Sequence, residues 1–173
     1  MRVFATLVPA RETLPVAIEI ERKFVVVDVP AATVLGAGVR IRQGYLAEDG
    51  DVELRVRITG DTATLTVKAG RGLVRTEVES VVTQDEAEAL WPHTEGRRID
   101  KVRHRVALAE SVVEVDVYGG ALAGVVVAEV EFDSEGASNR FEPPPWFGPE
   151  VTGARGWSNA ALARSGRPPD PSG

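Results

Sequence analysis

The stretch "IEIERKF" at residues 18–24 alternates charged and apolar side chains and places Glu19, Glu21 and Lys23 together. Successive side chains of a β-strand point to opposite faces, so these three share one face of a predicted strand. The ordinary interpretation of such a face is contact with water on one side of an antiparallel sheet. The later segments of the chain favour a different interpretation.

The two-residue alternation recurs in seven further segments. They cover residues 39–46, 51–58, 62–70, 73–80, 100–108, 112–120 and 125–132. Asp49-Gly50 joins the first two segments, and most of the other connections also contain glycine, which is typical of hairpin turns. The pattern predicts a mainly β (α+β) fold, an eight-stranded antiparallel closed barrel with a few short covering helices.

Helices are few in this sequence. A capping-box pattern at Thr83 predicts a helix that ends before Pro92, and short helices are also predicted over residues 134–141 and 157–164. The proline-rich residues 142–150 predict an extended, rigid loop.

Composition limits the class of protein. The chain has 173 residues, of which 43% are hydrophobic and 27% charged, and this predicts one soluble globular domain. We expect a disordered or mis-assigned extension over residues 1–16, the domain over 17–166, and a disordered tail over 167–173. The absence of cysteine and of a signal-peptide or membrane-span pattern favours the cytoplasm and no membrane partner. A net charge of −6 argues against nucleic acid as a partner, and the oligomeric state stays open.

Like charges follow one another along single strand faces. The pairs are Glu77/Glu79, Glu114/Asp116, Glu129/Glu131, Arg40/Arg42, Arg55/Arg57 and Arg103/Arg105. An exposed sheet usually intersperses opposite charges, because neighbouring like charges repel. Clustered carboxylates are stabilised by a hard divalent cation, and clustered arginines and lysines by a polyanion such as phosphate. A barrel with its charged faces inward would therefore hold a metal–polyphosphate complex.

The ordered segments "EIERKF", "ELRVR", "TVK", "RTEVE", "EGRRIDKVRHR", "EVDVY" and "AEVEF" resemble the CYTH family, also called triphosphate tunnel metalloenzymes. Its ExExK signature corresponds to Glu19, Glu21 and Lys23, and the resemblance extends from Ile18 to "NAAL" at residues 159–162. The segments "LWPHTEGRRIDK" and "FEPPPWFG" further resemble short bacterial members linked to hydrolysis of inorganic triphosphate. The resemblance implies a tunnel that binds linear triphosphate with Mg²⁺ or Mn²⁺ and hydrolyses it to pyrophosphate and phosphate.

The resemblance also implies roles for individual residues. Barrel closure would bring Glu19 and Glu21 beside Glu129 and Glu131 as metal ligands. The implied phosphate-binding set is Lys23, Arg40, Arg42, Arg55, Arg57, Lys68, Lys101 and Arg103. The implied supporting acids are Glu77, Glu79, Glu114 and Asp116. The placement of Arg40 and Arg75 depends on register, since a one-residue slip turns a side chain to the other face.

The expected chemistry is attack of water on a terminal phosphorus, with cations neutralising the charge that develops. Lys101, Glu21 and Glu131 are the candidate catalytic residues. Water activation is open between a lumen carboxylate, the metal ion and Lys101, if neighbouring bases depress its pKa. Tyr45 is a further candidate, because its hydroxyl would lie near the lumen.

Other functions remain open within the same fold. They are hydrolysis of nucleoside or thiamine triphosphate, cyclisation of ATP by an adenylate cyclase, and non-catalytic binding of polyphosphate or nucleotide. Few aromatic residues alternate into the predicted lumen, which disfavours an organic substrate group. At the C-terminal helix, relatives often carry a tyrosine followed by lysines around the asparagine, where this chain reads "GWSNAAL". Arg155 and Arg164 are possible substitutes for those lysines.

Overall fold

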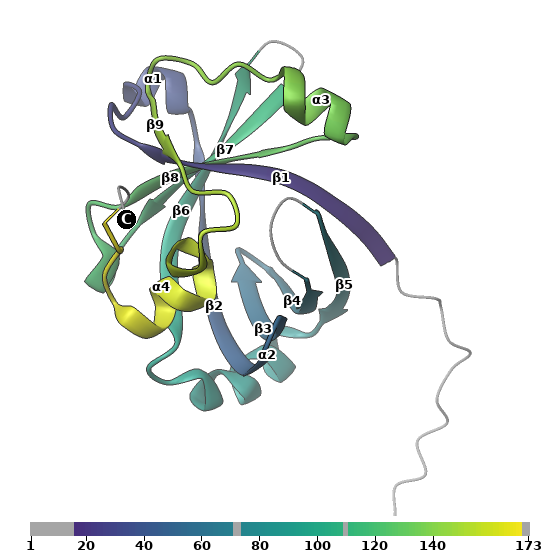
Figure 1. Ribbon diagram of the computed structural model, residues 1–173. Helices are drawn as coiled ribbons and strands as arrows, with labels where there is room; N and C mark the ends of the chain where they lie inside the picture. Colours follow the sequence, from purple (N-terminus) through teal and green to yellow (C-terminus); the bar gives the residue numbers. More distant parts are fainter. Residues whose placement is uncertain (1–15, 71–73, 109–110, 171–173) are drawn as a thin grey trace, which may run out of the picture.

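A closed antiparallel barrel forms the body of the protein in the computed structural model, which describes residues 16–70, 74–108 and 111–170 (Figure 1). The barrel strands are β1 (Val16–Val26), β2 (Gly38–Asp49), β3 (Val52–Thr59), β4 (Thr62–Ala69), β5 (Val74–Val82), β6 (Arg98–Leu108), β7 (Ser111–Tyr118) and β8 (Val126–Glu131). Their order is β5-β4-β3-β2-β6-β7-β8-β1, and pairing of β1 with β5 closes the ring. The predicted fold class is therefore confirmed. Most of the expected N-terminal extension, and the last three residues of the expected tail, lie outside the described residues.

Strand β1 closes the barrel by pairing with different neighbours along its length. Its first half, up to Ile20, pairs with β5, whereas the residues from Glu21 to Val25 pair with β8. Beyond the residues of β1 that pair with β5, a ninth strand, β9 (Phe147–Glu150), pairs with the end of β1. The expectation of a loop over residues 142–150 is therefore wrong for its second half. A proline is tolerated there because β9 is a short edge strand.

Short helices cover the outside of the barrel. They are α1 (Ala32–Leu35), α2 (Gln84–Leu90), α3 (Glu135–Arg140) and α4 (Asn159–Ser165), with 3-10 turns η1 (Trp91–Thr94), η2 (Gly120–Leu122) and η3 (Arg155–Trp157). The predictions of α2, with its capping box at Thr83, and of α3 and α4 are confirmed. Among the described residues, the helices are too short and too polar to cross a lipid bilayer.

Apolar side chains of the strands face outward and are buried under these covering elements. One cluster places Phe24 and Val113 with Phe147 of β9, and another places Val56 and Ile58 with Ala87 of α2. Burial of the outward faces provides the hydrophobic stabilisation that the interior of a small barrel would otherwise supply. The inward faces are therefore available for polar and charged residues.

Helix α4 covers one end of the lumen. Its Ala160 and Leu162 are buried with Trp157 of η3 in a cluster that also contains the inward-facing Tyr45 and Tyr118. The lumen is thus apolar beside α4 and charged farther along the same strands.

Gly44 tests how tightly η1 packs on the barrel. A Cβ added at Gly44 would lie 2.5 Å from the Cβ of Thr94, which is completely buried. We expect Gly44→Ala to lower the free energy of unfolding by roughly 1–3 kcal/mol, because overpacking forces the backbone to shift. Urea denaturation measures the change. Gly136→Ala on α3 is the control, since its added Cβ would meet no atom closer than 3.4 Å, the end of the Arg140 side chain. Equal stability of both variants would contradict the prediction.

Candidate active site

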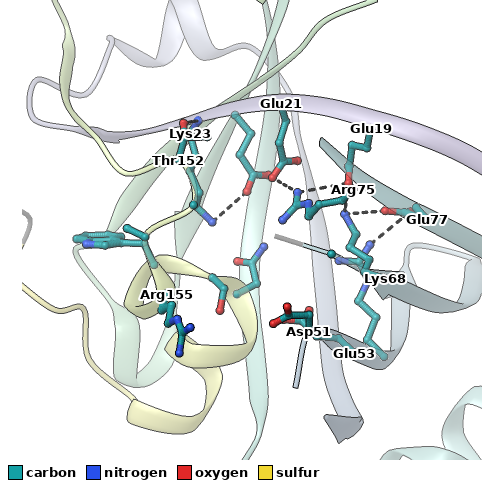
Figure 2. A pocket seen from close by; sticks show the side chains of 18 of the residues that line it. Glu19, Glu21, Lys23, Asp51, Glu53, Lys68, Arg75, Glu77, Thr152 and Arg155 are labelled. Carbon is teal, nitrogen blue, oxygen red and sulfur yellow. Dashed lines mark hydrogen bonds and ion pairs between the residues drawn. The ribbon is translucent and has the colours of Figure 1, made fainter. Parts of the chain in front are cut away.

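A cavity of about 340 Å³ occupies the lumen and opens between the β2–β3 hairpin and the segment that leads into α4 (Figure 2). Predicted site residues that line it are Glu19, Glu21, Lys23, Tyr45, Arg55, Arg57, Lys68, Glu77, Arg103, Glu129 and Glu131. The remaining predicted acids face inward as well, since Thr66 bonds Glu79, while Arg103 bonds Glu114 and Asp116. The structure therefore brings most of the predicted set together, and the role of each residue stays a prediction.

The seam between β1 and β8 holds three of the four predicted metal ligands, and the fourth, Glu19, lies just before it, where β1 pairs with β5. Glu21 lies directly opposite Glu131, and Lys23 lies opposite Glu129, with 3.1 Å between the Lys23 Nζ and a Glu129 carboxylate oxygen. Like charges directly opposite each other on neighbouring strands repel. The seam thus concentrates negative charge, which Lys23, Arg75 and Arg103 neutralise in part.

Arg75 of β5 bridges the two acids of β1. Its Nη2 lies 3.3 Å from Glu19 and also forms an ion pair with Glu21 (Figure 2). The side chain is thus directed inward in the register that the structure adopts. Despite Arg75, burial and the neighbouring Glu129 carboxylate raise the pKa of Glu21 to about 7. Burial, together with Glu114 and Glu19, raises the pKa of Glu131 in the same direction.

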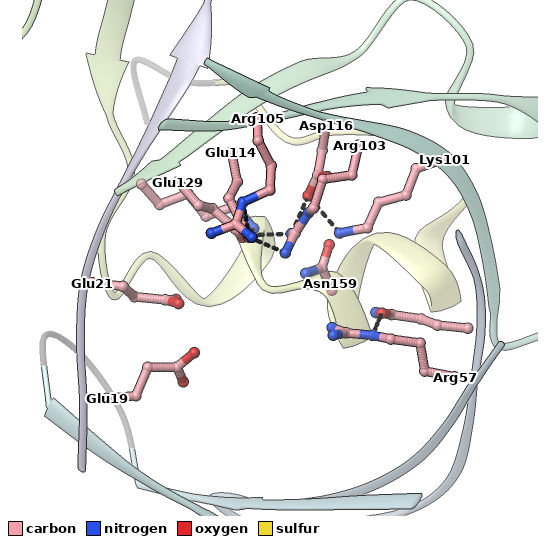
Figure 3. Close-up of polar contacts among 12 residues, drawn as sticks. Glu19, Glu21, Arg57, Lys101, Arg103, Arg105, Glu114, Asp116, Glu129 and Asn159 are labelled. Carbon is pink, nitrogen blue, oxygen red and sulfur yellow. Dashed lines mark hydrogen bonds and ion pairs between the residues drawn. The ribbon is translucent and has the colours of Figure 1, made fainter. Parts of the chain in front are cut away.

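A network on β6 and β7 holds Lys101 (Figure 3). The Lys101 side chain is completely buried and its Nζ donates to Asp116. Arg103 donates to the same carboxylate at 2.7 Å and also pairs with Glu114 and Glu129. Burial lowers the pKa of Lys101 to about 8, although the Asp116 carboxylate opposes the shift.

Two buried arginines of β3 have fewer partners. Arg57 Nε donates to Gln43 at 3.3 Å, and the described residues provide no carboxylate within ion-pair distance of it. Burial, with the nearby charges of Arg55 and Arg103, lowers the pKa of Arg57 to about 10. Arg55 lies 3.7 Å from Glu77, and its Nε has no hydrogen-bond partner among the described residues. A buried cation without a counter-charge is costly, so an anion would be stabilised here.

Arg40 and Arg42 lie on the outer face of the barrel, and the prediction that they bind phosphate in the lumen is wrong. Arg40 is 68% exposed and pairs with Asp100 of β6. Arg42 pairs with Glu88 of α2, and its guanidinium lies 4.9 Å from the centre of the Trp91 ring. These partners outside the barrel neutralise both arginines. Before the register shift that follows Tyr45, the inward positions of β2 hold uncharged residues such as Gln43 and Tyr45 instead.

Uncharged residues of the lumen were not predicted from the sequence, because the prediction relied on the pattern of charged residues. Gln43 and Thr66 are completely buried, and Gln43 donates to the hydroxyl of Tyr45 at 2.7 Å. The segment before α4 adds Thr152, whose hydroxyl accepts from the backbone N–H of Lys23, and the first residue of α4 adds Asn159. For Thr66 the available signal was its place on the same strand face as Lys68, whereas alternation could identify Gln43 only once the outward face of β2 was known. The segment near α4 offered no comparable pattern.

Arg155 and Arg164, the expected substitutes for basic residues of the C-terminal helix, both line the cavity. Arg164 pairs with Glu48 of β2, which connects α4 to the β2–β3 hairpin.

The carboxylates suit a hard divalent cation. Among the described residues, no three acidic or histidine side chains already converge on one point as a metal site. Mg²⁺ commonly uses only one or two carboxylates together with water and substrate phosphate oxygens. The carboxylates of Glu21 and Glu131, opposed across the strands and both with raised pKa, would provide such a pair.

Comparisons with known proteins agree with this geometry. The family profile of the CYTH domain matches residues 17–143. An inorganic triphosphatase from Nitrosomonas europaea is 44% identical over 149 residues, which are 85% of this chain and 97% of that protein. An inorganic triphosphatase from Acetivibrio thermocellus is 37% identical over 149 residues, which are 85% of this chain and 94% of that protein. A crystal structure of an inorganic triphosphatase superposes with a TM-score of 0.64 at 41% identity, covering 84% of this chain and 94% of that chain.

The raised pKa of Glu21 predicts a pH-dependent stability. The folded protein holds this proton more tightly than the unfolded chain, so the contribution of Glu21 to stability is lost as pH rises from about 4.5 to 7. We expect Glu21→Gln to gain on the order of 2 kcal/mol in unfolding free energy relative to the unsubstituted protein between pH 5 and pH 8. Urea denaturation in the presence of a chelator measures this difference.

Glu19→Gln is the matched control for this measurement. Burial acts to raise the pKa of Glu19, but the Lys68 ammonium outweighs burial and lowers it. Its carboxyl is therefore largely ionised in both states over this pH range. Since the Glu19 charge is one of the smaller causes that raise the Glu21 pKa, the variant should show a much smaller pH-dependent gain than Glu21→Gln. Parallel curves for Glu21→Gln and the unsubstituted protein would contradict the prediction.

Proposed function

The chain belongs to the CYTH domain family, and we propose that it hydrolyses inorganic triphosphate to pyrophosphate and phosphate inside its charged lumen. The observation that carries the proposal is the pair of buried arginines, Arg55 and Arg57, facing a cavity whose β1–β8 seam carries the carboxylates. The names of the curated relatives support the same activity.

Binding of triphosphate would complete the charge balance of the lumen. Arg57 can bind a phosphate oxygen without first breaking an ion pair to a carboxylate. Its planar guanidinium can donate to two phosphate oxygens at once. Lys23, Lys68 and Arg103 are held by carboxylates and would exchange part of these contacts for phosphate. Substrate binding therefore rearranges existing ion pairs.

Glu21 and Glu131, with Glu19 and Glu129 beside them, would hold Mg²⁺ or Mn²⁺. A bound cation supplies neutralisation of the negative charge that develops on the phosphate oxygens. These carboxylates would hold the cation at the β1–β8 seam, and Figure 3 shows Glu19 and Glu21 across the lumen from Arg57. Glu77, Glu114 and Asp116 hold basic side chains in place, and Glu79 accepts a hydrogen bond from the Thr66 hydroxyl.

Hydrolysis requires attack by water on a terminal phosphorus and a group that takes its proton. With its pKa lowered to about 8, Lys101 can exchange a proton at Nζ near neutral pH, and Asp116 fixes the position of that nitrogen. Glu21 and Glu131 are the carboxylate candidates for the same task. Tyr45, completely buried beside Gln43, contributes a hydroxyl to the cavity wall.

We also propose that residues 17–166 form one domain that acts in the cytoplasm. The continuous sheet from β1 to β9, with α4 packed on it, supports the domain boundaries. The cysteine-free sequence supports a reducing compartment.

Phosphate release tests the proposed activity. The purified protein is assayed with triphosphate, long-chain polyphosphate, ATP and thiamine triphosphate, each with Mg²⁺, Mn²⁺ or a chelator. We expect release from triphosphate to be fastest and to require a divalent metal. Faster release from ATP or thiamine triphosphate would overturn the substrate assignment, and no metal-dependent release from any substrate would overturn the enzymatic function.

Two arginines on opposite faces of the barrel provide a matched test of the site. We expect Arg57→Gln to lower kcat/KM for triphosphate by about 10- to 100-fold, because a buried charged contact to phosphate is lost. Arg40→Gln removes an arginine of the outer face and should stay within about twofold of the unsubstituted enzyme. Steady-state kinetics on both variants, with thermal melting as a check of folding, decide the matter. Equal losses of kcat/KM in the two variants would contradict a specific role of Arg57 in the lumen.

A further inference from the structure

Tyr118 connects the barrel wall to the helix that covers the lumen. It faces inward from β7, on the same face as Glu114 and Asp116, and is only 2% exposed. Its hydroxyl donates a hydrogen bond to the side-chain oxygen of Asn159, the first residue of α4. The surroundings are the apolar cluster beside α4, so a side-chain hydroxyl and an amide meet there in a largely apolar environment.

The hydrogen bond fixes which end of the Asn159 amide faces the cavity. Because Oδ1 accepts from Tyr118, the Nδ2 group with its two N–H donors is turned away from Tyr118. Asn159 lines the lumen cavity, and the hydrogen bonds among the described residues do not use its Nδ2. Figure 3 shows this nitrogen on the side of the open lumen. Two N–H donors are therefore available to a molecule in the cavity.

Other side chains at the start of α4 are less suited to this task. The Ser158 hydroxyl accepts from the backbone N–H of Ala161 as the cap of the helix, and Ala160 is apolar. Arg164 is paired with Glu48. Asn159 is thus the side chain of this helix whose donors remain directed at the cavity, which it shares with Arg57 and Arg103.

We propose that Asn159 binds the phosphate chain of the substrate through Nδ2, and that Tyr118 is the positioning residue that holds the amide in this orientation. The inference rests on the proposed function and adds a neutral contact to its cationic ones. An amide donor binds a phosphate oxygen without adding a positive charge next to Arg57, Arg103 and Lys101, which already repel one another. A lysine at this place would increase that repulsion.

Steady-state kinetics with triphosphate test both roles. We expect Asn159→Ala to raise KM about 5- to 10-fold with kcat changed less than about threefold, because a contact common to ground and transition states is lost. Tyr118→Phe keeps the ring, over which the Lys101 ammonium lies at 5.6 Å, and removes only the hydroxyl. It should raise KM in the same way by a smaller factor.

The double variant separates positioning from general structural support. If Tyr118 acts through Asn159, Tyr118→Phe combined with Asn159→Ala should be no worse in KM than Asn159→Ala alone. Asn139→Ala, an exposed asparagine of α3, is the control and should leave KM unchanged. Unchanged KM in Asn159→Ala would overturn the inference for both residues, and additive effects in the double variant would overturn the positioning role.

A binding measurement keeps the inference distinct from the proposed hydrolysis. Calorimetric titration of sodium tripolyphosphate into the protein, in chelator, should give weaker binding for Asn159→Ala than for the unsubstituted protein. If neither protein releases phosphate but the difference in binding persists, the inference stands and the enzymatic function fails. Equal binding by the two proteins would overturn the inference whatever the turnover.

Discussion

Because the barrel is closed, a charged side chain that points into the lumen must be neutralised by an opposite charge inside the lumen. Arg103 meets this requirement with three carboxylates, and Lys23 with the carboxylate of Glu129. The requirement is unmet at two places among the described residues. Arg57 has no carboxylate within ion-pair distance, and Glu131 faces Glu21 across the strands without a basic side chain within ion-pair distance. An anion and a cation are therefore missing from the same cavity, and a metal–triphosphate complex provides both.

Alternation in the sequence predicted the eight barrel strands and, for most of them, the face that turns inward. It failed for β2, where Arg40 and Arg42 alternate as regularly as Arg55 and Arg57 do on β3. Alternation distinguishes two faces of a strand but does not say which one is inside. For β2 the choice depends on Asp100 and Glu88, which neutralise the arginines from segments far along the chain. Only the assembled fold contains that information.

Neutral residues are the second group that the sequence could not assign. Three uncharged residues, Gln43, Thr66 and Asn159, belong to no charge pattern. They contribute to the lumen through hydrogen bonds, whose directions only the folded structure shows. Strand β9 escaped prediction for a related reason, since its pairing with Phe24 and Val26 depends on where β5 leaves β1. Both cases depend on contacts between segments that are distant in sequence.

The divided pairing of β1 also bears on how the protein folds. Glu21 and Glu131 are neighbours across the strands although 110 positions separate them in the chain, so the β1–β8 contact closes a very long loop. The hairpins from β2 to β8 need much shorter loops, and contacts of high sequence separation form slowly because loop closure opposes them. The carboxylates proposed to hold a metal ion come together only when this contact forms. Occupancy of the site is therefore restricted to the completely folded chain, and a bound ligand would stabilise that state selectively.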